Sequence, residues 1–269
     1  MPSTIRKGSR GPDVTLCQTC LNDHGYQCDV DGIFGSGTES KVKAFQNASN
    51  LVPDGVVGQH TWNKLLQVDD VIEPPSAEEI LAHAVSLGYE TWDTVNRLWL
   101  FGIRSPTRDS NAFDDLLGCI WVDEYGIRQV VYWPGTTDPG LYWLLHPSRS
   151  EGCAILVEGQ YLDTWTIDLH GGKYEALCQR AKEVSVYRDD TLDDKLDLDK
   201  GTIMTGWFGI NIHAATQVEG AESTVVDRWS AGCQVHATDS GFDQMMNLAY
   251  MQRDQGRTTF SYALMDQWW

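Results

Sequence analysis

The stretches GINIH, residues 209–213, and WSAGCQ, residues 229–234, decide what the fold of this chain has to bring together. The first is an apolar, strand-like run that ends on His213, and the second places Cys233 behind a turn of small residues. A free thiol, with a pKa of about 8.5, is only a few per cent ionised near neutral pH, and a nearby imidazole is the usual way to activate it. We therefore predict that Cys233 is a nucleophile and that His213 is its base.

The turn before Cys233 has a second predicted role. Small residues at 231 and 232 let a carbonyl group approach the backbone N–H groups of residues 231–233, which would form an oxyanion hole. The alternative is an inert pair, because free cysteines are among the most buried residue types and the chain has seven cysteines and seven histidines. His236, three residues after Cys233, is a rival base that we rank below His213 because it follows the turn.

Length and composition indicate a folded protein of one large or two unequal domains. The chain has 269 residues, of which 42% are hydrophobic and 22% charged. Acidic residues number 38 and basic residues 20, so the net charge is -18. Such a surface repels phosphate backbones and anionic lipids, so we expect no nucleic acid partner and no membrane insertion. We expect a monomer that needs no cofactor.

Export and redox features point to cytoplasmic synthesis. Residues 1–20 lack the apolar region of a signal peptide, and no segment approaches the ~18 uninterrupted apolar residues of a membrane span. The odd number of cysteines fits reduced thiols better than a full set of disulfides. We therefore expect a protein made in the cytoplasm without a signal peptide.

An internal repeat marks the first part of the chain. Residues 31–38, DGIFGSGT, align with residues 54–61, DGVVGQHT, at an offset of 23. Each unit carries an Asp-Gly turn, an apolar pair, a glycine suited to positive φ and a threonine placed to cap the next helix. Apolar residues at helical spacing lie around the units, and the pattern predicts three short helices joined by two similar turns.

These residues resemble the helical peptidoglycan-binding domain of wall-active enzymes, over about residues 5–67. The resemblance rests on Gly8, Gly11, Val14, Gln18, Leu21, Gly25, Tyr26, residues 30–35, Thr38, Val42, Phe45, Gln46, Leu51, residues 54–58, Thr61, Trp62 and Leu65. It implies that residues 1–68 form a module that docks on bacterial peptidoglycan.

A thiol cluster in this module has two interpretations. Cys17, Cys20, His24 and Cys28 are spaced so that they could hold zinc. In the resembled pattern, however, positions 17 and 20 fall on the buried helix face. We therefore favour buried apolar thiols and predict no metal site.

A linker and a β-rich region follow. Residues 68–76, VDDVIEPPS, read as a linker, and Ser76 with Glu79 predicts a helix start, so residues 69–97 are expected to be linker and a connecting helix pair. Residues 98–269 turn β-rich. Strands are predicted at 98–104, 119–122, 129–133, 153–158, 164–169, 184–188, 207–213 and 260–264, and a helix at 239–252.

This second region resembles the L,D-transpeptidase catalytic domain over roughly residues 98–265. The resemblance rests on His213, which lies 17 positions before Ser230 and 20 before Cys233, on Gly232, and on residues 136–142, TTDPGLY, which would lead into a strand. It implies an α+β multidomain protein: a small three-helix N-terminal domain, linker helices and a mainly β, L,D-transpeptidase-like C-terminal domain at residues 98–269.

The resemblance also implies a mechanism. Cys233 would attack a stem-peptide carbonyl of murein to give a thioester, His213 would carry the proton, and Ser230 would fix the turn or hold the histidine. The chain departs from the family pattern at Ala214, at Ala231, where His is common, and at Gln234, after which Arg is missing. Candidate contacts to substrate are therefore Arg228, Trp229, His170 and Gln234.

The leading hypothesis is a peptidoglycan-degrading cysteine peptidase, similar to a phage endolysin, that acts on the bacterial cell wall. The alternatives are an L,D-transpeptidase, which shares the thioester, and a non-catalytic wall-binding virion protein. A zinc amidase with His170 and His213 as ligands lacks a matching motif. The acidic run at residues 189–199 lacks the order of a calcium loop, so a solvated loop is expected there.

Overall fold

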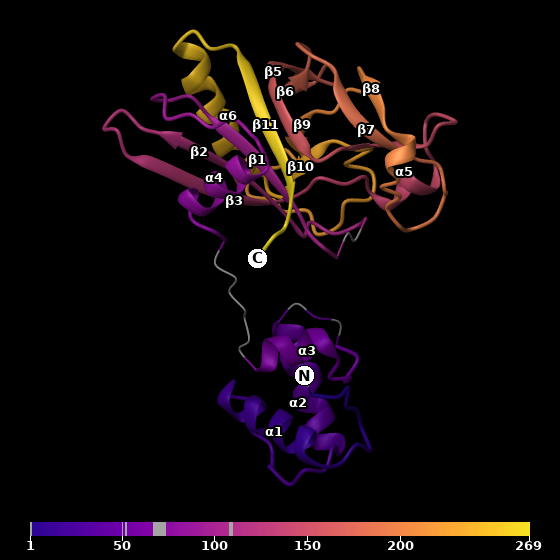
Figure 1. The fold of residues 1–269 in the computed structure, drawn as a ribbon. Coiled ribbons are helices and arrows are strands. Elements are labelled where there is room, and N and C mark those ends of the chain that lie inside the picture. The colour runs from indigo at the N-terminus through magenta and orange to yellow at the C-terminus, as the bar shows by residue number, and fades with distance from the viewer. Residues whose placement is uncertain (1, 50, 52, 67–73, 108–109) are drawn as a thin grey trace. The chain divides into compact units, whose positions relative to one another are not determined.

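The computed structural model of the protein describes residues 2–49, 51, 53–66, 74–107 and 110–269. The chain divides into two compact units, Met1–Pro74 and Pro75–Trp269. Figure 1 shows a small helical unit and a larger unit built mainly of strands. Most of the predicted linker, namely residues 68–73, lies outside the described residues.

The N-terminal unit contains the predicted helices, namely α1 (Pro12–Asp23), α2 (Ser36–Ala48) and α3 (Gln59–Leu65). Their apolar residues meet in one core around Leu21, Phe45 and Trp62, and Cys17 and Cys20 are part of that core. The thiols at these two positions are therefore packed as apolar groups. The small three-helix domain expected from the repeat is confirmed.

Each repeat unit is held together by hydrogen bonds from a glutamine side chain and not by helix caps. The Gln18 side chain donates to Asp31 Oδ1 at 2.8 Å and to Thr38 Oγ1 at 3.2 Å, and Gln46 makes the same pair of bonds in the second unit. The expected capping role of the threonines is wrong, because the N-caps are Gly35 and Gly58. These glycines have φ of -85° and -86°, so the positive φ falls instead on the Asp-Gly glycines.

The C-terminal unit begins with one helix, α4 (Ala77–Ser86). Ser76 and Glu79 form the predicted capping box at its start. The expected second helix is absent from the described residues 87–98, where Gly88 at φ 82° follows the helix end. Ile80 and Ala84 pack with Trp99 and Phe101, so α4 is part of the C-terminal core.

Most strands of this unit close into a barrel in the order β1-β11-β5-β6-β9-β10-β3-β2, as expected for a mainly β domain. The barrel strands are β1 (Trp99–Arg104), β2 (Asp115–Val122), β3 (Arg128–Thr136), β5 (Gly159–His170), β6 (Tyr174–Gln179), β9 (Ile212–Ala214), β10 (Gln234–His236) and β11 (Thr259–Asp266). A second sheet contains β4 (Cys153–Leu156), β7 (Val184–Asp189) and β8 (Met204–Gly206) in the order β4-β7-β8, and η1 (Lys200–Thr202) precedes β8.

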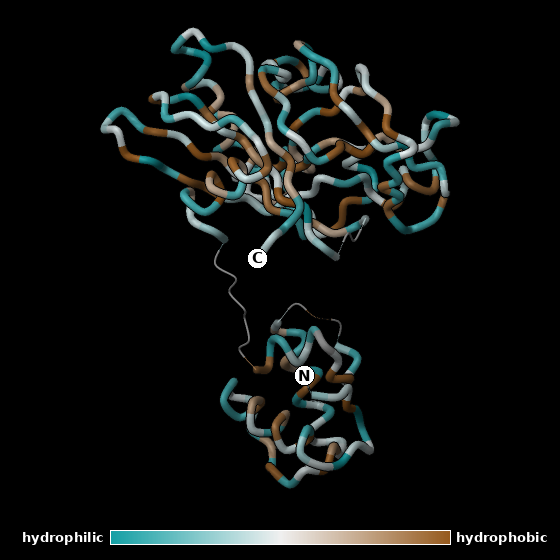
Figure 2. Tube along the Cα trace, in the orientation of Figure 1, coloured by the Kyte–Doolittle hydropathy of each residue, from teal (hydrophilic) through white to brown (hydrophobic). Residues whose placement is uncertain are grey.

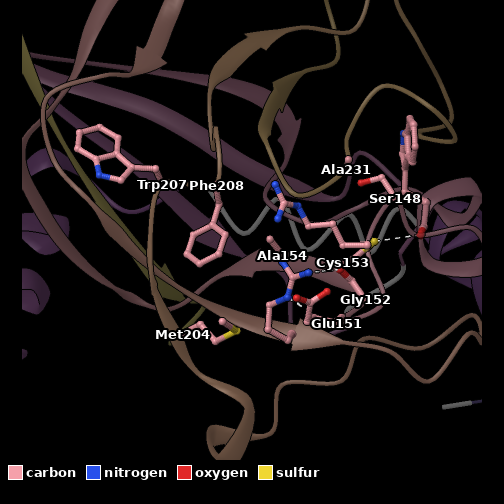
Figure 3. Close-up of a pocket in the computed structure, with 12 residues that line it drawn as sticks. Ser148, Glu151, Gly152, Cys153, Ala154, Met204, Trp207, Phe208 and Ala231 are labelled. Atoms are coloured by element: carbon pink, nitrogen blue, oxygen red, sulfur yellow. Dashed lines mark hydrogen bonds between the residues drawn. The ribbon is translucent and has the colours of Figure 1, made fainter.

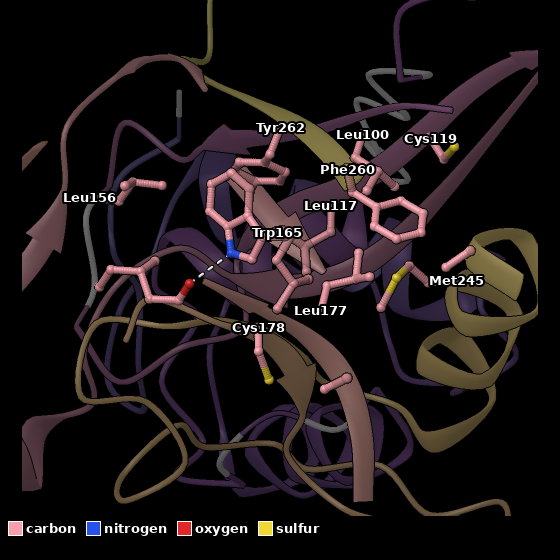
Figure 4. Close-up of a cluster of buried hydrophobic side chains, with 14 of the residues drawn as sticks. Leu100, Leu117, Cys119, Leu156, Trp165, Leu177, Cys178, Met245, Phe260 and Tyr262 are labelled. Carbon is pink, nitrogen blue, oxygen red and sulfur yellow. Dashed lines mark hydrogen bonds between the residues drawn. The ribbon is translucent and has the colours of Figure 1, made fainter. Parts of the chain in front are cut away.

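The barrel core is aromatic and aliphatic. Trp165 lies in it near Leu177 and Tyr262, and its indole Nε1 donates to the carbonyl of Ile210 at 2.7 Å (Figure 4). Helix α6 (Asp239–Asp254), predicted from its apolar spacing, adds Phe242 and Met245 to this core. Hydrophobic residues gather along the central strands, and the loops are mainly hydrophilic (Figure 2). Among the described residues, no helix has the length and apolar character needed to cross a membrane.

Two predicted strands differ from the structure. Residues 207–211 are not a strand, and β9 starts only at Ile212, because Gly209 has φ 73° and turns the chain. The segment after residues 136–140 enters a short helix, α5 (Leu141–Leu145), where a strand was expected. Gly140 packs so closely against the backbone of Asp227 that a Cβ would lie 2.1 Å from its carbonyl oxygen.

Candidate functional site

The turn that presents Cys233 is held by its own hydrogen bonds. Ser230 Oγ donates to the carbonyl of Cys233 at 2.8 Å and accepts the N–H of Gly232 at 3.1 Å. Gly232 has φ 119°, and a Cβ there would lie 1.8 Å from the carbonyl oxygen of Ala154. Only glycine fits this position, so the small residue is a geometric requirement of the turn.

The barrel pairing brings the two opening stretches together. β9 and β10 run parallel, with Ile212 opposite Gln234 and His213 opposite Val235, and Gln234 N–H extends the ladder by donating to Asn211 O at 2.9 Å. Paired residues in a sheet share a face and neighbours along a strand alternate. Cys233, beside Asn211, therefore lies on the same face as His213, opposite the face that Ile212 turns to the barrel core.

The thiol of Cys233 sits between backbone groups. Asn211 N–H points at Sγ at 3.4 Å, and Sγ lies 3.5 Å from the carbonyl oxygen of Gly209. No hydrogen bond joins Cys233 to His213 among the residues that the structure describes. Burial raises the pKa of the Cys233 thiol to about 11, so the resting thiol is protonated.

His213 is buried and its tautomer is set by the backbone. Nδ1 lies 3.0 Å from the carbonyl oxygen of Ala214, which can only accept, so Nδ1 carries the proton and Nε2 has the free lone pair. Burial, with a smaller contribution from His170, lowers the pKa of His213 to about 3. The ring is therefore neutral at rest, as a general base must be.

His170 lies directly against His213. The two rings stack with their centroids 4.1 Å apart, and Asn211 Nδ2 lies 3.0 Å from His170 Nδ1. Because Asn211 Oδ1 accepts the N–H of Gln179, Nδ2 must donate and His170 Nδ1 must accept. The proton of a neutral His170 is therefore on Nε2.

Sequence reasoning missed two members of this cluster, Asn211 and Tyr174. The Tyr174 hydroxyl donates to Ala214 O at 3.2 Å and lies 3.4 Å from His213 Nδ1. Asn211 precedes His213 by two positions, and residues two apart in a strand lie on one face. Strand periodicity could therefore have identified Asn211 as a neighbour of His213. Tyr174 carries no comparable signal, since its place depends on the β6 hairpin.

The backbone donors near the thiol are fewer than expected. The N–H of Gly232 is used by Ser230 Oγ, so it does not serve as a free oxyanion donor in this geometry. Within the described chain, no hydrogen bond is made by the N–H groups of Ala231 and Cys233, which leaves these two available.

The candidate substrate contacts fall into two groups. Arg228 and Trp229 are exposed beside the turn, and the Arg228 guanidinium lies 3.8 Å from the centre of the Tyr142 ring. Gln234, in contrast, is fully buried: its Oε1 accepts from the Tyr262 hydroxyl at 2.8 Å. The interpretation of Gln234 as a substrate contact is corrected, because strand alternation turns this side chain into the barrel, away from Cys233.

A cavity of about 200 Å³ lies next to the turn (Figure 3). Ala231 forms one part of its wall and Trp207 with Phe208 another. Ala154 and Cys153 of β4 line it as well, and the Cys153 thiol donates to the carbonyl of Trp143 at 3.0 Å. Cys153 is thus already engaged with the backbone.

The rival residues occupy other environments. His236 is buried between the rings of Trp133 and Phe242, and burial lowers its pKa to about 3. It follows Gln234 on the same side of β10 and so turns away from Cys233. In the acidic run, Asp189 accepts from Thr191 and from the N–H of Asp197.

The next feature is the set of side chains that could bind a metal ion. Among the described residues, no group of three or more His, Cys, Asp or Glu side chains could hold a metal ion. In the N-terminal thiol cluster, His24 Nε2 bonds Leu65 O at 3.0 Å and Cys28 Sγ bonds Gln18 O at 3.8 Å.

Comparison with known proteins identifies the N-terminal domain. Residues 10–65 match the family described as "Putative peptidoglycan binding domain". The chain is 37% identical over 70 residues, 25% of its length, to the zinc D-Ala-D-Ala carboxypeptidase of Streptomyces albus G. This and two further curated relatives are matched over only 28–31% of their own length.

Two solved structures were also similar. The Burkholderia AP3 phage endolysin is 34% identical, with 33% of this chain and 34% of that chain covered and a TM-score of 0.25. The L,D-transpeptidase of Xylanimonas cellulosilytica covers 98% of both chains at 18% identity, with a TM-score of 0.24. At scores this low, neither structure supports a conclusion about the C-terminal site.

Proposed function

We propose that this chain is a peptidoglycan peptidase in which Cys233 is the nucleophile and His213 the base. The observation that carries the proposal is the parallel pairing of β9 and β10, which sets Cys233 and His213 on one face while Ala214 O holds the His213 proton on Nδ1. The match of residues 10–65 to a peptidoglycan-binding family supports the bacterial wall as the substrate. The name of the Streptomyces albus G relative, a D-Ala-D-Ala carboxypeptidase, agrees with wall chemistry.

The reaction proceeds in two acyl-transfer steps. In the first, the thiol proton moves to His213 Nε2 as Sγ bonds the scissile carbonyl carbon, and the collapsing intermediate expels the amine, which takes that proton. The product is a thioester on Cys233. In the second, His213 removes a proton from water, hydroxide replaces sulfur at the carbonyl carbon, and the thiol and a free carboxylic acid are released.

The resting site must be activated by its substrate. A thiol with a pKa near 11 and an imidazole with a pKa near 3 do not form a thiolate–imidazolium pair on their own. Proton transfer therefore accompanies attack, and the N–H groups of Ala231, Cys233 and Asn211 stabilise the developing negative charge. Ser230 keeps the turn in place through its two hydrogen bonds.

Digestion of purified murein in water enriched in ¹⁸O tests the proposal. The wild-type chain is expected to release peptides with one ¹⁸O in each new carboxylate, and Cys233→Ala to release none. Cys28→Ala, which removes a partly buried thiol of the N-terminal unit, is the matched control and should act like wild type. Activity should survive a chelator and be lost to a thiol-alkylating reagent.

Other outcomes point to the alternatives. New cross-links without ¹⁸O would identify an L,D-transpeptidase, in which an amine replaces water as the acceptor of the thioester. Equal murein turnover by wild type and Cys233→Ala would contradict a catalytic role and favour a wall-binding virion protein.

We further propose a lytic, endolysin-like role for the peptidase, with synthesis inside a bacterial host. Cells that express the chain should lyse only when a separate membrane lesion gives it access to the wall, and Cys233→Ala should prevent that lysis. Lysis that is unaffected by Cys233→Ala would contradict this role.

A further inference from the structure

The cavity beside the nucleophile shares its walls with the two segments that touch Cys233. Ala231 lines it directly before Gly232 and Cys233, and Phe208 lines it directly before Gly209, whose carbonyl lies 3.5 Å from the thiol. A group bound in this cavity is therefore next to the scissile bond of a substrate held at Cys233. Trp207, Phe208 and Ala231 are seen around it in Figure 3.

Arg188 of β7 is the charged group built into this cavity. Its side chain is buried, with the residue only 7% exposed. Nε donates to the carbonyl of Glu151 at 3.2 Å and Nη2 to the carbonyl of Gly152 at 2.5 Å. Within the described residues, no salt bridge to a carboxylate is made by Arg188. The guanidinium also lies 5.8 Å from the centre of the Phe208 ring, so its partners among the described residues are uncharged and provide no counter-ion.

The nearby carboxylates do not neutralise Arg188 by contact. Glu151, also on the cavity wall, accepts from Ser150 Oγ at 2.8 Å. Asp189 bonds Thr191 and the N–H of Asp197. Arg149 adds a second, exposed positive charge at the rim. The cavity thus carries two arginines and one glutamate in a chain whose net charge is -18.

The strand register fixes how far Arg188 lies from the nucleophile. Gly232 packs on the carbonyl of Ala154, and Ala154 is the β4 partner of Arg188 on β7. Paired residues in an antiparallel sheet have Cα atoms about 5 Å apart, so Arg188 lies on the order of 10 Å from the Cys233 turn. An extended peptide spans about 3.4 Å per residue. This distance corresponds to about three residues of extended peptide, so a carboxylate within about three residues of the scissile carbonyl would reach the guanidinium.

We propose that this cavity binds a free carboxylate of the substrate peptide, with Arg188 as the specificity-determining residue and the aromatic walls excluding water around the pair. The inference rests on the function proposed above and narrows its substrate class to peptides with an unamidated carboxylate near the cleaved bond. A planar guanidinium with free donor positions suits a carboxylate, and a low-dielectric wall strengthens the pair. The carboxylate belongs either to a side chain or to the peptide C-terminus.

Binding of synthetic stem peptides to the full-length Cys233→Ala chain tests the proposal by calorimetry. One peptide keeps every carboxylate, and in the others a single carboxylate, at the C-terminus or on a side chain, is replaced by carboxamide. We expect one carboxamide to weaken binding by about 10- to 100-fold, the range for a hydrogen bond to a charged group. The position that matters identifies the source of the carboxylate, and the same carboxamide should lower kcat/KM of the wild-type chain.

Arginine variants test whether Arg188 is the residue that causes the preference for a free carboxylate. Arg188→Gln should bind the free and amidated peptides equally, whereas Arg253→Gln, an exposed arginine of α6 paired with Asp254, should keep the preference. If Arg188→Gln fails to fold, Arg188→Lys is tested in its place. It should reduce the difference in affinity between the free and amidated peptides, because lysine keeps the charge but lacks the fork of donors.

The outcomes separate this inference from the proposed function. Equal binding of all peptides, or a preference that survives in Arg188→Gln, overturns the carboxylate cavity even if the wild-type chain cleaves murein. A preference lost in Arg188→Gln, in a chain whose wild type cleaves nothing, supports the cavity and overturns the peptidase.

Discussion

At the scale of single residues, the resting Cys233 and His213 are both uncharged. Burial raises the thiol pKa to about 11 and lowers the imidazole pKa to about 3. In the mechanism proposed above, the site therefore differs from cysteine enzymes that store a thiolate, and the reactivity of Cys233 has to come from substrate binding and from donors around Sγ.

The first prediction concerns alkylation of Cys233 by iodoacetamide. Near neutral pH about one thiol in 10⁴ is ionised at a pKa near 11, so alkylation should be roughly 300-fold slower than that of free cysteine. The rate should rise steadily with pH toward 11. Peptide mass spectrometry measures it, and rapid alkylation at pH 6 would instead reveal a preformed ion pair.

The second prediction concerns Gly232→Ala. The added Cβ would lie 1.8 Å from Ala154 O at a φ of 119°, so the turn must move. We expect a loss of stability of about 3 kcal/mol or more, together with loss of murein cleavage. Gly220→Ala is the control, because its φ is also positive, 72°, but nothing lies within 4 Å of its Cβ. Thermal unfolding of both variants separates the clash from the backbone strain, and equal effects would argue against the contact.

At the scale of elements, β9 and β10 each carry a buried neutral histidine, His213 and His236. The folded-state pKa of each is about 3, below the ordinary value of 6.5, so between these values the unfolded chain binds more protons. Their contribution to stability is therefore full above pH 6.5 and is lost as pH falls toward 3.

The third prediction uses His236→Leu to isolate one of these histidines. Its Nδ1 is buried and has no hydrogen-bond partner among the described residues, so an apolar replacement should be tolerated at pH 7. Between pH 4.5 and 5.5 the free energy of unfolding should depend on pH less steeply than in wild type, by about 1.4 kcal/mol per pH unit, the value for one proton. Urea titrations at several pH values measure the slope, and an unchanged slope would show that His236 is protonated in the folded chain.

The same elements show how far sequence patterns reach. The repeat at residues 31–38 and 54–61 predicted the helical unit because its local turns and helices need few distant contacts. The pairing of β9 with β10 was not predicted, since a parallel ladder between residues 212–214 and 234–236 depends on tertiary structure. Gln234 was misread because β10 is too short for its alternation to be recognised, and Arg188 was missed because its importance arises from burial.

At the scale of the whole molecule, the two units have separate cores. The N-terminal core includes residues from Ile5 to Leu65, and the C-terminal clusters begin at Ala77. Wall binding and peptide cleavage should therefore be separable by single substitutions. In the proposed function, the N-terminal unit holds the chain on the wall and so raises the local concentration of stem peptides without taking part in the chemistry.

The fourth prediction is that Val42→Asp abolishes murein binding but not peptide cleavage, and that Cys233→Ala does the reverse. Val42 is fully buried in α2, and an unpaired charge there should unfold the N-terminal unit. This variant should no longer sediment with insoluble murein but should cleave a short soluble stem peptide at the wild-type rate. Cys233→Ala should sediment normally and cleave nothing. Near-ultraviolet circular dichroism of the tryptophan-rich C-terminal unit shows whether that unit stays folded in Val42→Asp. If it stays native and peptide cleavage is nevertheless lost, the N-terminal unit has a direct role in catalysis. Independent cores alone would leave Cys233 and His213 undisturbed.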